Sequence, residues 1–451
     1  MKERTKNKRE LGLYIHIPFC MKKCNYCDFL SFSSTEEEKE RYVQALCKEI
    51  LSFQGKKGEC IITTMFFGGG TPSILKGEQM ERIMGAINEA FLVDEEAEIT
   101  IEMNPGTVTK EKLEIYKKIG INRLSIGLQT TDDERLKVLG RIHTYEQFLQ
   151  NYQWARELGF QNISVDLMSA LPKEDLTSYQ KDLERILALK PEHISSYSLI
   201  IEEGTPFYEE EELLEQLPKE EEDRAMYELT GKLLQEEGYQ RYEISNYAKK
   251  GKESRHNSIY WTGKEYLGLG LGASSYLLAD HPYMESRNVM GQEEQREKEN
   301  YAESMEPQLG KGSEEEEGKK ETEEIKMIEG IEKTKGIEAL LKLYGYRFKN
   351  GSEFDKYCEK PDAICKEREE FLEVTEKDAM EEFMFLGLRM MKGVKKSEFF
   401  EKFSVEMEEV YGAVIEKFQA MGLLEEKGDV LSFTKKGIDV SNLVLCEFLM
   451  S

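Results

Sequence analysis

The chain has 451 residues, of which 39% are hydrophobic and 33% are charged, and its formal net charge at pH 7 is -26. This length is sufficient for two domains with ordinary hydrophobic cores. Such a negative charge argues against broad nucleic-acid binding, because phosphate groups would be repelled over most of the surface. We therefore expect no nucleic-acid partner.

The sequence shows no targeting or membrane-spanning segment. A basic tail, residues 1–10, precedes an apolar run that is soon interrupted by His16 and Pro18, which is unlike a signal peptide. No apolar run reaches the roughly 18 residues that a membrane-spanning helix needs. Eight cysteines, three clustered and the rest scattered, do not suggest a disulfide framework. We expect a cytoplasmic protein in a reducing environment.

A cysteine-rich loop follows the first predicted strand. Alternating apolar residues predict a buried strand over residues 11–17 that ends at Pro18, and Cys20, Cys24 and Cys27 follow with the spacing Cys-x3-Cys-x2-Cys. A closed zinc site or an ordinary four-iron cluster takes four protein ligands, whereas three thiolates leave one iron open to a small-molecule chelator. A disulfide pair with a spare thiol, or a zinc knuckle lacking one ligand, is the alternative.

Further strands alternate with amphipathic helices as far as residue 200. Strands are predicted at 61–67, 98–103, 123–128, 162–168 and 193–200, and helices at 36–53, 78–92, 110–119, 145–158 and 175–189. This repeat predicts an α/β fold with a parallel sheet curled into a partial (β/α)6 barrel, and an open doubly wound sheet is the alternative. In both folds, ligands bind at the carboxyl ends of the strands.

Ligand-binding residue types gather at that edge of the predicted sheet. The glycine-rich segment 68–71, Glu102, Gln129 and Asp166 each lie at or just past the end of a predicted strand. Glycines permit close backbone approach to a ligand, and carboxylates and amides can bond hydroxyl and amino groups. We expect these residues to share one site with the cysteine loop.

Two motifs follow in residues 201–290, after a helix predicted at 220–237. The segment from His256 to Trp261 places an imidazole beside aromatic side chains. The glycines at 268, 270 and 272 resemble a nucleotide fingerprint only superficially, because no phosphate-cradling helix clearly follows. Close backbone packing, or room for a flat ligand, is the preferred interpretation.

The C-terminal third changes composition twice. Residues 291–378 predict an acidic, low-complexity and largely disordered insert, which separates a core domain at 11–290 from a second domain at 379–451. Helical patterns near 379–391 and 405–421, followed by a small hairpin, predict a mainly helical, winged-helix-like fold. Such folds often contact DNA, but this one carries many acids and no basic recognition helix, so a lid or partner surface is favoured.

The motifs resemble the radical S-adenosylmethionine superfamily, within it the oxygen-independent coproporphyrinogen III oxidase-like group, and most closely the haem-chaperone branch of that group. The resemblance covers residues 11–290 and 379–451. It implies that Cys20, Cys24 and Cys27 hold a [4Fe-4S] cluster whose open iron binds S-adenosylmethionine. The residues it places beside S-adenosylmethionine are Tyr14, Tyr26, Gly69, Gly70, Thr71, Glu102, Gln129, Arg141 and Asp166.

Two features favour the chaperone branch over the oxidase branch. The oxidase signature carries an additional Cys two positions after the third cluster ligand, where this chain has Phe29. The chaperone branch has a His-Asn-x-x-Tyr-Trp segment, matched here by His256, Asn257, Tyr260 and Trp261. This resemblance implies haem bound at that segment, through axial ligation by the imidazole and ring stacking.

The expected function is therefore transfer of haem to acceptor proteins such as respiratory cytochromes, with no residue assigned a catalytic role. The alternative is a radical enzyme that oxidatively decarboxylates coproporphyrinogen III. A related methyltransferase or haem-degrading enzyme is a third reading that the barrel alone does not exclude. Peripheral membrane contact and a homodimer stay open at this point.

Overall fold

The computed structural model describes residues 8–284, 342–361 and 370–449. The chain divides into two compact units. The first unit comprises Met1–Ser275 and Phe348–Glu370, and the second comprises Tyr276–Arg347 and Phe371–Ser451. No helix among the described residues is both long and apolar enough to cross a membrane.

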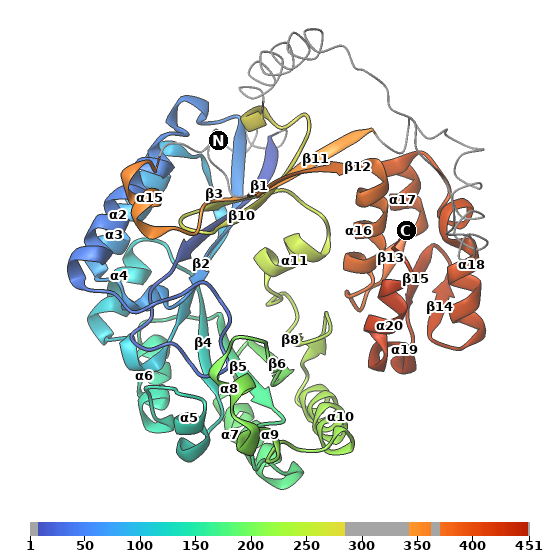
Figure 1. The fold of residues 1–451 in the computed structure, drawn as a ribbon, viewed down its shortest axis with the longest axis horizontal. Coiled ribbons are helices and arrows are strands. Elements are labelled where there is room, and N and C mark those ends of the chain that lie inside the picture. The colour runs from blue at the N-terminus through green and yellow to red at the C-terminus, as the bar shows by residue number, and fades with distance from the viewer. Residues whose placement is uncertain (1–7, 285–341, 362–369, 450–451) are drawn as a thin grey trace, which may run out of the picture. The chain divides into compact units, whose positions relative to one another are not determined.

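The first unit is built on a curved sheet of parallel strands with helices outside it (Figure 1). The strands are β1 (Arg9–Ile17), β2 (Cys60–Gly69), β3 (Val93–Met103), β4 (Arg123–Gln129), β5 (Ile163–Ser169) and β6 (His193–Ser198). The outer helices are α2 (Glu36–Leu51), α3 (Gly77–Ala90), α4 (Lys110–Lys118), α5 (Asp133–Val138), α6 (Tyr145–Glu157) and α7 (Leu176–Leu189). Every strand and helix predicted from β1 to β6 is confirmed.

The strand order distinguishes the partial barrel from the doubly wound alternative. Strands β1 to β6 neighbour one another in chain order and pair in parallel, without the reversal that defines a doubly wound sheet. The sheet continues in the order β9-β1 at one side and β6-β8-β7 at the other. Strands β7 and β9 do not pair in the described part of the chain, so the barrel is open.

The remaining elements of the first unit are strands that extend this sheet and further helices. They are α8 (Pro206–Glu209), α9 (Glu211–Leu214), α10 (Glu220–Glu236), β7 (Gln240–Arg241), β8 (Asn246–Ala248), α11 (Arg255–Trp261), β9 (Tyr266–Leu269) and α15 (Phe354–Glu359). Strand β8 pairs antiparallel with β6, and β9 pairs parallel with β1. Figure 1 shows α11 on the inner side of the curved sheet, opposite the outer helices.

Local sequence explains where helix α2 begins and why nearly every residue of strand β2 is buried. Helix α2 starts with a capping box, in which the Thr35 hydroxyl accepts from the Glu38 amide and the Glu38 carboxylate accepts from the Thr35 amide. Nearly every residue of β2 is buried, as expected for a parallel strand covered on both faces. The sheet therefore forms the core of the first unit.

The second unit combines three strands, helices and a small antiparallel sheet. Strands β10 (Ser274–Leu278), β11 (Leu343–Lys349) and β12 (Glu370–Thr375), which lie mostly in this unit, are ordered β12-β11-β10. The other elements are α16 (Glu376–Gly387), β13 (Val394–Lys395), α17 (Lys396–Phe403), α18 (Met407–Ala420), β14 (Leu424–Lys427), β15 (Val430–Phe433), α19 (Lys435–Asp439) and α20 (Ser441–Cys446). Helices followed by the β14–β15 hairpin confirm the winged-helix-like prediction.

The predicted disorder of 291–378 does not hold for the part that the structure describes. Residues 342–361 and 370–378 form β11, α15, β12 and the start of α16, whereas 291–341 and 362–369 lie outside the described residues. The Asn350 amide donates to the buried Glu49 carboxylate at 2.7 Å, and the Tyr357 hydroxyl donates to the same group. A buried carboxylate requires such donors, and residues 348–361, which supply them, belong to the first unit.

Candidate functional site

The three predicted cluster cysteines lie in one loop directly after β1. Cys20, Cys24 and Cys27 are all partly exposed free thiols. The loop is held by backbone hydrogen bonds from the Cys20 amide to the Phe32 carbonyl and from the Asn25 amide to the Leu139 carbonyl, each of 3.0 Å. The strand end and its neighbours thus fix the loop that carries the thiols.

The thiols are not arranged as ligands of a single ion. Among residues 8–284, 342–361 and 370–449, no three His, Cys, Asp or Glu side chains are close enough to hold one metal ion. A zinc site needs such a compact set, whereas a cluster of several irons spreads its protein ligands over separate atoms. Three thiolates in one loop are a donor set that an iron–sulfur cluster can use.

Two residues from other loops contact the cysteine loop. The Cys20 sulfur lies 3.5 Å from the Thr71 hydroxyl, and the Cys24 sulfur lies 3.6 Å from Nη1 of Arg141. Two of the residues predicted beside S-adenosylmethionine, Thr71 and Arg141, are thus in contact with predicted cluster ligands.

The glycine-rich loop after β2 leaves no room for side chains. Gly69 has a φ of 109°, in the left-handed region, and a Cβ added there would lie 2.5 Å from the His16 ring. A Cβ on Gly70 would lie 2.7 Å from the Phe19 carbonyl oxygen. Glycine is therefore required at both positions by close packing against His16 and the Phe19 carbonyl.

His16 explains why the loop needs glycine, and the sequence alone did not single it out. Its ring bonds the Tyr14 hydroxyl at 3.0 Å through Nδ1 and the Leu30 carbonyl at 3.0 Å through Nε2. Burial lowers the pKa of His16 and raises that of Tyr14. The predicted residue Tyr14 thus positions His16, which supports the glycine loop.

Two carboxylates lie deep in the barrel and keep some exposed surface. Glu102 accepts a hydrogen bond from the Gly69 amide at 3.2 Å, and Asp166 accepts from the Ser125 and Ser164 hydroxyls, each at 3.4 Å. Burial, together with the nearby Asp166 charge, raises the pKa of Glu102 to about 8. Burial also raises the pKa of Asp166. Paired carboxylates of this kind favour a cationic or proton-donating ligand between them.

Gln129 and Arg141 complete the mouth of the barrel. Gln129 has a φ of 78°, and its side-chain oxygen accepts from the Tyr197 hydroxyl at 3.1 Å. Arg141 donates to the Gly127 carbonyl, and its buried Nε has no hydrogen-bond partner in the described part of the chain. Tyr197 was missed from the sequence, although its place near the end of β6 was a usable signal.

Tyr26 lies within the cysteine loop and packs against an apolar cluster. It contacts a cluster formed by Leu139, Met168, Leu171, Phe207 and Leu213. Burial raises its pKa, while Arg141 acts in the opposite direction. The structure therefore places Tyr26 beside Arg141 and the cluster loop, as a packing residue for that loop.

The predicted haem-binding segment forms α11, inside the barrel and away from the cysteine loop. The His256 ring bonds the Thr64 hydroxyl through Nδ1 and the Tyr260 hydroxyl through Nε2, both at 2.9 Å, and stacks on Phe66. Thr64 precedes Gly69 by five residues on β2, which is roughly 16 Å along a strand. Thr64 is in the middle of β2, so His256 packs against the middle of the strand and not at the strand end that leads to the glycine-rich loop.

This environment conflicts with His256 as an axial haem ligand. The imidazole has no exposed surface, and burial lowers its pKa to about 3. Both ring nitrogens already have partners, so neither is directed at a ligand. The other residues of the motif, Asn257, Tyr260 and Trp261, are half-buried on the same short helix.

Comparison with known proteins agrees with this architecture. Residues 14–186 match the family model described as the radical SAM superfamily, and residues 374–440 match the HemN C-terminal domain. The heme chaperone HemW of Bacillus subtilis is 32% identical over 441 residues, which covers 97% of this chain and 98% of the relative. The chain belongs to the HemW family. HemW of Lactococcus lactis is also 32% identical, over 97% of both chains.

A relative that matches part of the chain and a solved structure that matches its fold are consistent with HemW membership. HemW of Escherichia coli is 39% identical over 58% of this chain and 69% of its own length. The solved structure of coproporphyrinogen III oxidase, HemN, from Escherichia coli has a TM-score of 0.74 at 20% identity and covers 99% of this chain and 92% of that one. This likeness shows a shared fold. Radical SAM membership implies a [4Fe-4S] cluster and S-adenosylmethionine.

Proposed function

We propose that this protein is a haem chaperone, which binds a [4Fe-4S] cluster, S-adenosylmethionine and haem and transfers haem to acceptor proteins such as respiratory cytochromes. The observation that carries the proposal is the similarity to two curated heme chaperones over nearly the full length of both chains. The oxidase alternative is represented by a solved structure that is 20% identical, and a likeness at this identity shows the fold alone. Phe29, in the place of the additional oxidase cysteine, also favours the chaperone.

Cys20, Cys24 and Cys27 would hold the cluster. When bound, the cluster can supply an electron to the sulfonium of S-adenosylmethionine. The Arg141 guanidinium, 3.6 Å from the Cys24 sulfur, stabilises a thiolate there by a charge-assisted contact. The Thr71 hydroxyl plays a similar but neutral role beside Cys20.

The barrel interior beside the cluster loop would hold S-adenosylmethionine. Gly69 and Gly70 carry no side chain, so an extended ligand can lie close to the backbone at the end of β2. Glu102 and Asp166 provide acceptors for an amino group or hydroxyls. Gln129, which is fixed by Tyr197, adds an amide at the barrel mouth.

Haem binding is proposed without ligation by His256. Before it could bind iron, His256 would have to give up both hydrogen bonds and leave the barrel interior. We propose instead that α11 closes the barrel interior, with His256 as its buried anchor.

An assay of haem transfer to an acceptor protein tests the proposed function. The reconstituted protein is loaded with haem and mixed with an excess of an apocytochrome under anaerobic conditions, and the Soret band is followed over time. We expect haem to move to the apocytochrome faster than it leaves the protein when apocytochrome is absent. Haem release at the same rate with and without the acceptor would reject active transfer.

A further inference from the structure

Arg123, the first residue of β4, is a buried cation that lacks a partner. Its side chain is only 1% exposed, and its Nε has no hydrogen-bond partner in the described part of the chain. No acid that the structure describes lies at ion-pair distance from it. A buried charge is destabilising unless it is paired and hydrogen-bonded. Arg123 therefore needs a partner that the described residues do not provide.

Strand pairing places Arg123 on the inner face of the barrel. Phe66 faces the interior, because it stacks on the His256 ring of α11. Phe66 is paired with Thr100 on β3, and Thr100 is paired with Arg123 on β4. Side chains of paired residues point to the same face of a sheet. The buried Thr100 hydroxyl also has no partner among the described residues, so two unsatisfied polar side chains are neighbours in the barrel interior.

The two carboxyl groups nearer the barrel mouth do not neutralise Arg123. Glu102 accepts from the Gly69 amide, and Asp166 accepts from the Ser125 hydroxyl. Burial and the Asp166 charge raise the pKa of Glu102 to about 8, so Glu102 is mostly neutral at pH 7. Burial also raises the pKa of Asp166, although Arg123 acts in the opposite direction. A carboxylate in direct contact with an arginine would have a lowered pKa, so neither group is its counter-ion.

The other titratable groups around Arg123 are already engaged. Both ring nitrogens of His193 and of His256 make hydrogen bonds. Burial, followed by the charge of Arg123, lowers the pKa of both imidazoles, so they are neutral at pH 7. Glu98 accepts from the backbone amides of Arg255 and His256 at the start of α11. None of these groups supplies a negative charge in contact with Arg123.

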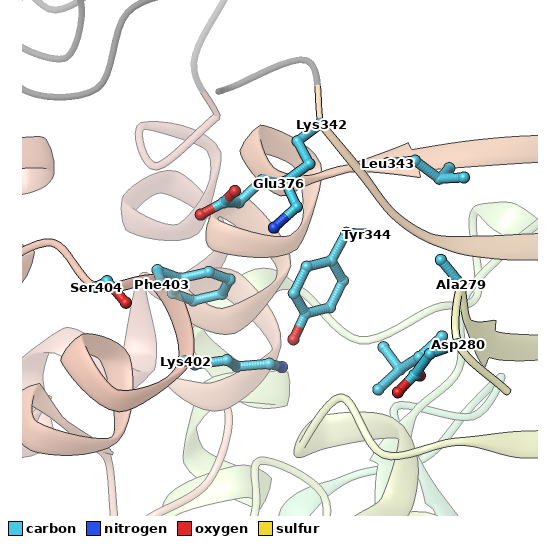
Figure 2. Close-up of a pocket in the computed structure, with 10 residues that line it drawn as sticks. Ala279, Asp280, Lys342, Leu343, Tyr344, Glu376, Lys402, Phe403 and Ser404 are labelled. Carbon is cyan, nitrogen blue, oxygen red and sulfur yellow. The ribbon is translucent and has the colours of Figure 1, made fainter. Parts of the chain in front are cut away.

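A pocket in the second unit shows the opposite arrangement. Figure 2 shows Lys342 and Lys402 in its lining together with Asp280 and Glu376. Two cations and two acids line that pocket, so the protein itself balances the charge there. Arg123 has no acid in contact with it and is the stronger candidate for binding an anion from solution.

We propose that a small monovalent anion, either a halide or the carboxylate group of an organic ligand, binds at Arg123, with the guanidinium and the Thr100 hydroxyl as its donors. Thr100 lies two residues before Glu102 on β3, so the anion would lie between Glu102 and α11. One guanidinium balances one negative charge, and the nearby Asp166 would repel a dianion. Glu102 and Asp166 are partly exposed, which gives a small ion a path from the barrel mouth. The proposal does not depend on the chaperone function.

The dependence of stability on the anion tests the site. Wild type, Arg123→Gln and Arg82→Gln, each at full length with the reconstituted cluster, are unfolded in urea in sodium bromide, sodium formate or sodium gluconate at equal ionic strength. Gluconate is a bulky monoanion and serves as the reference salt. Arg82→Gln is the matched control, because Arg82 lies on the outer helix α3 and is ion-paired with Glu40 at 2.6 Å.

We expect bromide, formate or both to raise the urea midpoint of the wild type and of Arg82→Gln relative to gluconate, because a ligand that binds only the folded protein stabilises it. Arg123→Gln should bind the anion at least about tenfold more weakly, so its midpoint should be the same in the three salts. A response to formate but not to bromide would identify an organic carboxylate as the ligand, and the reverse would identify a halide. Equal wild-type midpoints in the three salts, or an equal rise in Arg123→Gln, would overturn the site.

Diffraction covers the case in which Arg123→Gln does not fold. Wild-type crystals are grown with bromide and, separately, with formate, and bromide is located by its anomalous scattering. We expect a bromide or a formate within hydrogen-bond distance of the Arg123 guanidinium and the Thr100 hydroxyl. Only water at that position in both crystals, or a direct ion pair between Arg123 and Asp166, would reject the proposal.

Discussion

Replacing His256 with alanine distinguishes a buried structural residue from a haem ligand. The substitution removes both 2.9 Å hydrogen bonds of the ring and its stacking on Phe66, at a centroid distance of 5.3 Å. Each polar group left without a partner costs about 1–3 kcal/mol when buried. Thr64 is 2% exposed, so its hydroxyl would bear that cost, and lost ring packing adds to it.

We expect the free energy of unfolding to fall by roughly 3–5 kcal/mol, which is a large part of the total stability of an ordinary domain. Urea unfolding followed by far-UV circular dichroism measures this change. Asn257→Ala is the control, since Asn257 is half-buried and its recorded hydrogen bond is made by the backbone. It should cost less than about 1 kcal/mol.

Haem affinity is measured on the same His256→Ala protein, per folded molecule and at low temperature. The barrel-closing role predicts that this affinity stays close to that of the wild type. A variant that is as stable as the wild type but has lost the haem absorption band would refute this reasoning and restore His256 as a ligand.

Three further substitutions test the cluster and S-adenosylmethionine site. Cys27→Ser should lose most of the reconstituted iron, measured by iron analysis, whereas Cys47→Ser should retain it; equal iron would exclude Cys27 as a ligand. The raised pKa of Glu102 makes the folded protein retain a proton that the unfolded chain releases, so wild-type stability falls as pH rises from 4.5 to about 8. Glu102→Gln should therefore make stability depend less on pH. An unchanged pH dependence of the free energy of unfolding in urea would reject the raised pKa. Gly70→Ala should weaken S-adenosylmethionine binding at least tenfold in calorimetry, whereas Gly85→Ala, with nothing within 4 Å of its added Cβ, should bind normally.

Local pattern was sufficient to predict the barrel. Each strand from β1 to β6 is a short apolar run that ends at Pro, Gly or a polar residue, and each intervening helix has its own apolar face. Chain order then fixes the neighbours, because successive βα units pack in parallel. The residues at the strand ends, such as Glu102 and Gly69, could be grouped for the same reason.

Contacts between distant segments could not be predicted from local sequence pattern. The motif from His256 to Trp261 was matched as a haem segment, but its burial depends on pairing with Thr64, 192 residues earlier. The role of Asn350 depends likewise on Glu49. The acidic tract around residues 314–317 led to a prediction of disorder that extended over residues 342–361, because composition does not reveal that a buried carboxylate elsewhere needs donors.

Glycine spacing gave the right interpretation without identifying the partners. Added Cβ atoms on Gly268 and Gly270 would lie 2.2 Å from the Ser274 carbonyl oxygen and 2.5 Å from the Tyr42 hydroxyl. Close backbone packing is therefore confirmed as the reason for these glycines. The partners could not be predicted, because the Tyr42 hydroxyl belongs to α2, more than 200 residues earlier.

The most direct test of the chaperone proposal is anaerobic reconstitution of the cluster, followed by titration with haem and, separately, incubation with coproporphyrinogen III and S-adenosylmethionine. Absorption spectra report haem binding, and product analysis reports decarboxylation. The account predicts tight haem binding and no decarboxylated porphyrinogen. Turnover of coproporphyrinogen III would contradict it and identify the protein as a biosynthetic oxidase.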